Sequence, residues 1–211
     1  MSIVAIVPAY NEEKTIADVV RPLLESGAFT RVLVVSDGSS DRTADVAHAA
    51  GADVLTLFPN RRKGGAMLAG VQATQGDQVA FFDADLIGLT ADHVRQLVAA
   101  AADPGVSMVC GLRDYGDVWN RLQVALPEIT GERVVRRSVL ECVPLEFWSG
   151  FRIEAAINVC AKRQGRTEKI VMRGLKMVPK WHKVGPKRGI EDAARMMVEV
   201  VQALAQAERI P

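Results

Sequence analysis

The chain has 211 residues, a length that suits one α/β domain with a substantial buried core. Apolar residues make up 49% and charged residues 24%, and the net charge of +1 gives no overall field that would attract nucleic acid. The 3 cysteines form no Cys-x-x-Cys pair, so a reducing cytosol is expected rather than a disulfide framework. No signal peptide and no run of about 20 apolar residues is visible.

In the first 111 residues, short apolar runs alternate with helical segments. Strands are predicted at 3–7, 32–35, 52–57, 78–82 and 106–111, and helices at about 12–25, 43–50, 65–74 and 91–101. Asn11 and Thr90 are expected to cap the first and fourth helices. The strands are apolar on both faces, which indicates an α/β fold with a mostly parallel sheet flanked by helices. In such sheets, ligands bind beyond the carboxyl ends of the strands. Four loops are therefore candidates: 8–13, 36–41, 59–64 and 83–88.

The remaining residues, 112–211, are less regular. A helix is predicted at 151–164 and a strand at 167–172, and the segment 131–137 is interpreted as a basic loop. The segment 174–189 is irregular and rich in lysine, arginine and proline, and it is a candidate for contact with anionic lipid. A final helix at 190–207 is expected to pack on the core or form a homodimer, with a membrane surface as the alternative. No linker is visible, so residues 1–211 are predicted to form a single domain.

Two aspartates directly follow the predicted strand 78–82. Asp83 and Asp85 are two residues apart, so their carboxylates can face the same crevice beyond the strand. A divalent cation takes hard oxygen ligands of this kind and could bridge them to a diphosphate. The alternative is a solvated turn that carries no chemistry.

The other loops offer groups suited to a nucleotide. Asp37 ends the second strand, where an acidic side chain can bind a ribose hydroxyl or a base edge, although a tight turn would use the same residues. Tyr10 offers an aromatic edge to a base. Lys63 precedes two glycines at a helix start, and it can meet phosphate oxygens. Neither a Walker sequence nor Gly-x-Gly-x-x-Gly is present, which disfavours ATPase and simple NAD sites.

Taken together, these loops resemble the successive signatures of glycosyltransferase family 2, in the order and spacing of that family. The matching segments are Ile6-Val7-Pro8-Ala9-Tyr10-Asn11-Glu12-Glu13, Val35-Ser36-Asp37-Gly38-Ser39-Ser40-Asp41-Arg42-Thr43, Lys63-Gly64-Gly65-Ala66 and Phe82-Asp83-Ala84-Asp85. The clear resemblance covers about residues 3–90. A weaker one extends through residues 130–137 to the acceptor-side loop of the dolichol- or polyprenyl-phosphate sugar transferases. It implies a GT-A fold, with residues 1–111 binding the nucleotide sugar and residues 112–211 binding the acceptor.

The resemblance also implies roles for individual residues. The nucleotide sugar would be held by Pro8, Ala9, Tyr10, Glu12, Asp37, Lys63, Asp83 and Ala84. Asp83 and Asp85 would bind Mg²⁺ or Mn²⁺, and Asp85 would be catalytic. The further polar metal ligand that follows Asp-x-Asp in the polyprenyl-phosphate branch is replaced here by Leu86-Ile87-Gly88. We therefore take the late histidine His182 as the candidate third ligand.

On the acceptor side, arginines and one glutamate are the candidates. Arg133, Arg136 and Arg137 are expected to bind an acceptor phosphate or the departing diphosphate in a loop that closes over the substrates, with a solvated basic turn as the alternative. Arg133 and Arg137 are counted as catalytic. Glu154 would be the general base if the acceptor is a hydroxyl, whereas a phosphate acceptor needs little help from a base. Its alternative role is that of an acidic residue stabilised at a helix start.

The predicted activity is metal-dependent transfer of a hexose from a UDP- or GDP-linked sugar to a polyprenyl or dolichyl phosphate. A small phosphorylated acceptor such as phosphoglycerate is the first alternative. A sugar-nucleotide pyrophosphorylase and a non-catalytic nucleotide-binding module are the others. The expected location is the cytoplasm, with peripheral contact to the inner face of the membrane as a further option, and no nucleic acid partner is expected.

Overall fold

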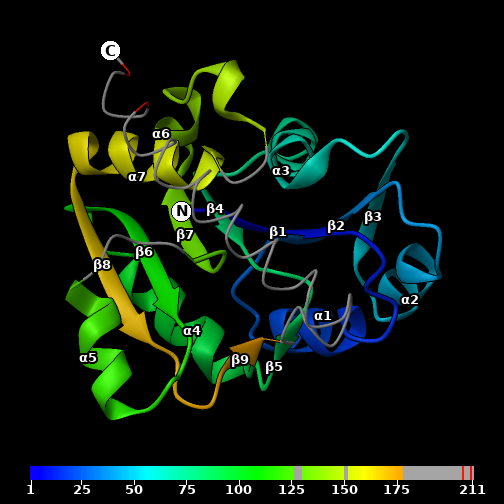
Figure 1. Cartoon of the computed structure of the whole chain (residues 1–211), viewed down its shortest axis with the longest axis horizontal. Helices are drawn as coiled ribbons and strands as arrows, with labels where there is room; N and C mark the ends of the chain where they lie inside the picture. Colours follow the sequence, from blue (N-terminus) through cyan, green and yellow to red (C-terminus); the bar gives the residue numbers. More distant parts are fainter. Residues whose placement is uncertain (126–129, 150–151, 178–205, 207–209, 211) are drawn as a thin grey trace, which may run out of the picture.

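The computed structural model describes residues 1–125, 130–149, 152–177, 206 and 210 (Figure 1). Its strands are β1 (Ile3–Ala9), β2 (Arg31–Asp37), β3 (Asp53–Leu57), β4 (Gln78–Phe81), β5 (Leu86–Ile87), β6 (Val106–Leu112), β7 (Arg133–Arg136), β8 (Arg166–Val171) and β9 (Lys176–Met177). Its helices are α1 (Ile16–Glu25), α2 (Thr43–Ala49), α3 (Arg62–Gln72), α4 (Ala91–Ala100), α5 (Asp117–Ala125), α6 (Arg137–Glu141), the 3-10 helix η1 (Leu145–Phe147) and α7 (Arg152–Gln164).

The centre of the fold is a 7-stranded sheet in the order β3-β2-β1-β4-β7-β6-β8. The pairs β1–β2, β1–β4, β2–β3 and β6–β8 are parallel, whereas β7 is antiparallel to both of its neighbours. The predicted fold class, a mostly parallel sheet flanked by helices, is therefore confirmed. Because β7 runs against the others, its first residues lie at the edge where the parallel strands end.

Helices cover both faces of this sheet (Figure 1). Along β1 the side chains alternate: Val4 and Ile6 face a core packed by α3, α6 and α7, while Ala5 and Val7 face a core packed by α1, α2 and α4. Strands buried on both faces explain the continuous apolar runs of the sequence. Among the described residues, no helix has the length and apolar character that crossing a bilayer requires.

Three differences from the sequence prediction stand out. Helix α1 begins at Ile16 rather than near residue 12, because Asn11 has a left-handed backbone (φ 55°) and accepts a hydrogen bond from Ser40 N rather than capping the helix. The segment 131–137, expected to be a loop, forms β7 and the start of α6. The final helix predicted at 190–207, with its roles in packing, dimerisation or membrane contact, falls almost entirely outside the described residues.

A separate two-stranded sheet joins the residues that follow Asp83 and Asp85 to residues 176–177. Strand β5 directly follows Asp85, and it pairs antiparallel with β9, with Leu86 opposite Met177. Gly88 lies so close to the second segment that a Cβ there would approach the carbonyl oxygen of Gly174 to 2.9 Å. The loop after the two aspartates is therefore shaped by residues almost ninety positions further along the chain.

Candidate active site

The polar residues predicted for the site gather where β1, β2 and β4 end. Tyr10 follows β1, Asp37 ends β2, and Asp83 lies two residues after β4. Register explains their common edge: Ala9 pairs with Ser36, and Ile6 pairs with Phe81. The carboxyl ends of parallel strands meet at one edge of a sheet, which is where ligands of α/β folds bind.

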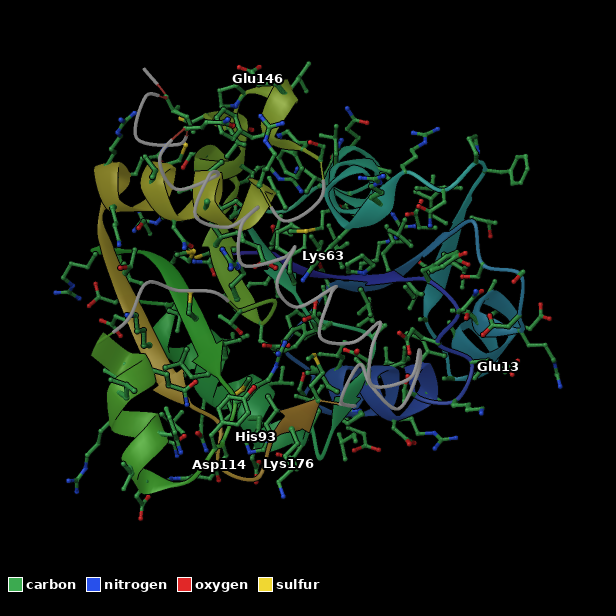
Figure 2. The ribbon with its side chains drawn as sticks, in the orientation of Figure 1. Glu13, Lys63, His93, Asp114, Glu146 and Lys176 are labelled. Atoms are coloured by element: carbon green, nitrogen blue, oxygen red, sulfur yellow. The ribbon has the colours of Figure 1, made fainter. Side chains whose placement is uncertain are left out.

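Five side chains of alternating charge form the centre of this edge. We call them the charge chain: Glu154, Lys63, Asp83, Arg113 and Glu132, in that spatial order. Lys63 Nζ lies 2.8 Å from Glu154 Oε1 and 2.7 Å from Asp83 Oδ1. Arg113 lies 2.8 Å from Asp83 Oδ2 and 3.1 Å from Glu132 Oε1, both through one terminal nitrogen. Figure 2 shows Lys63 between α3 and the middle of the sheet.

The charge chain sets the protonation of Asp83 and Lys63, whereas burial raises the pKa of Glu132 against the opposing effect of Arg113. Burial alone would raise the pKa of Asp83, but the cations of Lys63 and Arg113 outweigh it and hold that pKa below its ordinary value. Burial would lower the pKa of Lys63, but Asp83 and Glu154 raise it above its ordinary value. Asp83 is therefore a carboxylate, and Lys63 and Arg113 are cations, at neutral pH.

Two glycines allow this close approach. A Cβ on Gly131 would overlap the carboxylate of Asp83, so only glycine lets the chain before β7 pass so near. A Cβ on Gly64, beside Lys63 in α3, would lie 2.7 Å from the backbone of Trp148 and Ser149. The start of α3 thus rests on the segment that precedes α7, which brings Lys63 next to Glu154.

The loops predicted to hold the nucleoside are joined by hydrogen bonds. Glu12 N donates to Thr43 Oγ1 at 2.8 Å, and Glu13 N donates to Asp41 Oδ2 at 3.2 Å. Tyr10 is 54% exposed beside them, Ala9 and Ala84 are buried, and Pro8 is half-buried. These bonds hold the first two loops in one fixed relation.

Asp37 is buried, and one oxygen of its carboxylate accepts a backbone hydrogen bond. Its Oδ1 accepts a hydrogen bond from Arg61 N at 2.7 Å, and its own carbonyl accepts one from the Asn60 side chain. Burial raises the pKa of Asp37, although the backbone N–H groups of Arg61 and Arg62 oppose that shift. In this structure, Asp37 therefore fixes the loop that leads into α3.

The described residues contain no group of three or more His, Cys, Asp or Glu side chains placed to enclose a metal ion. Both oxygens of Asp83 contact cations, whereas Asp85 is half-buried at the same edge. Such a donor set fits a divalent ion that takes many of its ligands from a diphosphate rather than from the protein. His182, the predicted third ligand, lies outside the described residues.

The predicted arginine loop needs correction. Arg133 is fully buried, and its guanidinium donates to the Thr130 carbonyl and, at 3.0 Å, to Asn158 Oδ1, although its charge still helps to lower the pKa of Asp83. Arg136 pairs with Gln78 at the start of β4, so the strand carries it to the opposite edge of the sheet. Arg137 is there too, donating to Gly76 O at 2.7 Å. These three residues do not form a phosphate-binding loop that closes over the site.

Of the two roles predicted for Glu154, its position agrees with the acidic residue at a helix start rather than with the general base. Its side chain is in the first turn of α7, is 6% exposed, and accepts a hydrogen bond from Lys63. It therefore anchors a cation in this structure. Arg113 and Glu132 were not predicted at all, yet Arg113 immediately follows β6, a strand the sequence did predict, and the strand-end rule would have identified it.

Comparison with known proteins agrees with this arrangement. Residues 4–143 match the family model described as glycosyl transferase family 2. The chain belongs to glycosyl transferase family 2. The undecaprenyl-phosphate 4-deoxy-4-formamido-L-arabinose transferase of Pseudomonas aeruginosa is 31% identical over 164 residues, 65% of this chain and 48% of that protein. The dolichyl-phosphate beta-glucosyltransferase of Homo sapiens is 38% identical over 96 residues, 38% of this chain and 30% of that protein. The chain spans about half the length, or less, of these curated relatives.

A solved structure with the same fold is matched over the whole of this chain. Glucosyl-3-phosphoglycerate synthase from Mycobacterium tuberculosis, in complex with Mn²⁺, uridine-diphosphate-glucose and phosphoglyceric acid, has a TM-score of 0.80 and 26% identity. The match covers 100% of this chain and 80% of that one. The GT-A fold expected from the sequence is thereby confirmed, and two kinds of phosphorylated acceptor occur in the names of the relatives.

Proposed function

We propose that this chain transfers a hexose from a UDP- or GDP-linked sugar to a phosphate-bearing acceptor, with polyprenyl phosphate as the first candidate. The observation that carries the proposal is the charge chain centred on Asp83, with Asp85 beside it, at the strand ends of a family 2 fold. The site pairs cations that can meet phosphates with an acidic residue that can hold a metal ion.

Each residue of the site has a distinct part in this proposal. Tyr10 and Asp37, with Pro8, Ala9, Glu12 and Ala84 around them, bind the nucleoside. Lys63 and Arg113 face the diphosphate, whose negative charge grows as the sugar departs. Asp85 would hold Mg²⁺ or Mn²⁺, which would supply further positive charge to the diphosphate when bound. Asp83 keeps both cations directed at the same place.

The position of Glu154 favours a phosphate acceptor over a hydroxyl. A hydroxyl nucleophile needs a carboxylate or imidazole within hydrogen-bond reach to take its proton. Glu154, the predicted base, is buried against Lys63 at 2.8 Å. A phosphate oxygen is already anionic and attacks without that help.

Transfer to a small phosphorylated acceptor is the second candidate. It is favoured by the likeness, over the whole chain, to an enzyme crystallised with phosphoglyceric acid. The names of the curated relatives favour polyprenyl phosphate instead.

One panel separates these candidates. The protein is incubated with UDP- and GDP-sugars and Mn²⁺, with polyprenyl phosphate in one arm and phosphoglycerate in the other, and products are identified by mass. We expect a glycosylated polyprenyl phosphate, its loss with EDTA, and a fall of at least about 100-fold for Asp85→Ala. Asp18→Ala, a change at an exposed aspartate of α1, serves as the matched control and should retain full transfer.

Other results of the panel decide against the proposal. Product only with phosphoglycerate would select the second candidate. In an added arm that supplies a sugar phosphate and a nucleoside triphosphate, formation of a nucleotide sugar would identify a pyrophosphorylase. Nucleotide binding without any product would leave a non-catalytic module.

A further inference from the structure

The two ends of the charge chain are held very differently. Glu154 lies in the first turn of α7, where it contacts Lys63. Glu132 has a side chain with no exposed surface, immediately before β7, and its carbonyl accepts a hydrogen bond from Gly111 N at 2.8 Å. Thr130 Oγ1 lies within hydrogen-bond distance of its second carboxylate oxygen and, at 2.8 Å, of Gly111 O, and the single hydroxyl proton serves one of these acceptors at a time. Glu132 is thus fixed by its backbone and by its side chain.

Arg113 is the partner that balances this buried carboxylate. Among the described residues, Arg113 forms the only ion pair with Glu132. An ionised carboxylate without a cation would be costly inside the protein, so the two side chains stabilise each other. The pairing is structurally fixed, because Arg113 directly follows β6 and β6 is hydrogen-bonded to Glu132 through Gly111 and paired with the next residue, Arg133, through Cys110.

Asp83, in contrast, can release Arg113. Its other oxygen lies 2.7 Å from Lys63, so a cation remains with Asp83 when Arg113 turns to another anion. The contacts of the Arg113 guanidinium with both carboxylates come from one terminal nitrogen, whereas a guanidinium has five N–H donors. Arg113 therefore has a fixed partner in Glu132 and a partner in Asp83 that another anion can replace, and its N–H groups are suited to binding a phosphate.

We propose that Glu132 is a positioning residue that holds Arg113 in place to bind a phosphate group of a substrate. Glu132 acts through Arg113 and does not touch the substrate itself. The inference rests on the proposed function, because that function supplies the phosphate. The phosphate belongs to the diphosphate of the donor or to the acceptor, and the two sources are distinguished by measurement.

The test is a double-mutant cycle with Glu132→Gln, Arg113→Lys and the double variant. Glutamine keeps the shape of the side chain and removes its charge, and Glu168→Gln, at a half-buried glutamate of β8, is the matched control. Affinity for UDP or GDP with Mn²⁺ reports the donor arm, affinity for inorganic pyrophosphate reports phosphate binding alone, and KM for the acceptor reports the other arm.

We expect Glu132→Gln to weaken the binding of either the nucleotide or the acceptor by about tenfold, with kcat changed less than about threefold. In the Arg113→Lys background, the same substitution should have no further effect. Glu132→Asp, which keeps the charge, should restore part of the loss. Equal effects of Glu132→Gln in both backgrounds would overturn the proposal, since Glu132 would then act independently of Arg113. Unchanged affinity in both arms would overturn it too.

A second variant covers the case in which Glu132→Gln does not fold. Thr130→Val leaves the charge of Glu132 and removes the hydroxyl that orients it, so a loss of about threefold that vanishes with Arg113→Lys is expected. Additive losses would again contradict the proposal. If the wild-type protein binds pyrophosphate but transfers no sugar, the proposed function fails while the cycle on pyrophosphate still decides the role of Glu132. If it binds no phosphate compound, both fail.

Discussion

The two ends of β7 carry arginines with very different surroundings. At its first residue, where the parallel strands end, Arg133 lies behind Asp83 and contributes positive charge to a site of carboxylates and cations. Three residues later, roughly 10 Å away along the strand, Arg136 donates to the backbone carbonyl of Pro104, and Arg137, which begins α6, donates to that of Gly76. The arginine at one end of the strand adds positive charge near Asp83, whereas the arginines at the other end bind backbone carbonyls of neighbouring loops.

This difference shows that residue type and spacing did not decide the roles of these arginines. The direction of one strand did. Because β7 is inserted antiparallel between β4 and β6, a segment that looks like one basic loop is stretched across the sheet. We therefore expect substitutions at the edge of the site to reduce transfer more than stability, and substitutions at the opposite edge to reduce stability more than transfer.

The largest effect is expected for Asp83→Asn. Lys63 keeps Glu154 and Arg113 keeps Glu132, so the protein should fold, with unfolding free energy changed by less than about 3 kcal/mol. Both cations lose the carboxylate that directs them, and transfer should fall by about 100- to 1,000-fold. The matched control is Asp103→Asn, at an exposed aspartate of the opposite edge. Initial rates measure the loss of transfer, and chemical denaturation measures the change in unfolding free energy. Wild-type rates for Asp83→Asn would show that transfer does not need this carboxylate, which would contradict the proposed site.

A smaller effect on transfer is expected for Gly131→Ala. The added methyl group would overlap the Asp83 carboxylate and displace it from Lys63 and Arg113, so we expect rates to fall by about tenfold. Gly105→Ala is the comparison at the other edge, where the nearest atom is the flexible Asp103 Oδ1 at 3.2 Å. Steady-state kinetics on both variants would show the contrast, and equal rates for the two would mean that the position of Asp83 is not critical.

The smallest effect on transfer is expected for Arg137→Ala. Its side chain donates to Gly76 O at 2.7 Å and Val71 O at 3.2 Å, so its removal should cost about 1–3 kcal/mol of unfolding free energy. Rates per folded molecule should stay within about twofold of the wild type, because Arg137 lies far from Asp83 along the sheet. Denaturant titration and active-site titration separate the two quantities. A large loss of rate in fully folded protein would restore the phosphate-binding role that the structure argues against.

Most of the first half of the fold follows from its sequence. Doubly buried strands alternate with helices there, each connection is short, and Thr90 caps α4 by accepting a hydrogen bond from His93 N, as predicted. Periodicity is sufficient in that region because β1, β2 and β4 are buried on both faces and α1, α3 and α4 pack on the sheet through one apolar side. The start of α1 was misplaced because the Asn11 side chain serves the loop of Ser40, a contact across 29 positions.

The candidate site was predictable where it consists of strand ends and unpredictable where it depends on β7. Tyr10, Asp37, Lys63 and Asp83 follow from the strand-end rule and the family signatures. Glu132 could not be found in this way, because its proximity to Arg113 requires the insertion of β7 beside β6. No local pattern around Thr130 and Gly131 indicates that a buried carboxylate follows.

The ladder between β5 and β9 has a consequence for how the molecule is assembled. The residues after Asp85 obtain their backbone partners from Lys176 and Met177, so this segment cannot reach its final form until the chain through β9 has been added and docked. During synthesis from the amino terminus, a nascent domain that already contains every family signature still lacks the strand that pairs with the segment after Asp85, the proposed metal ligand. A truncation before Met172 should therefore yield a folded core in which β5, directly after Asp85, has lost its partner strand β9.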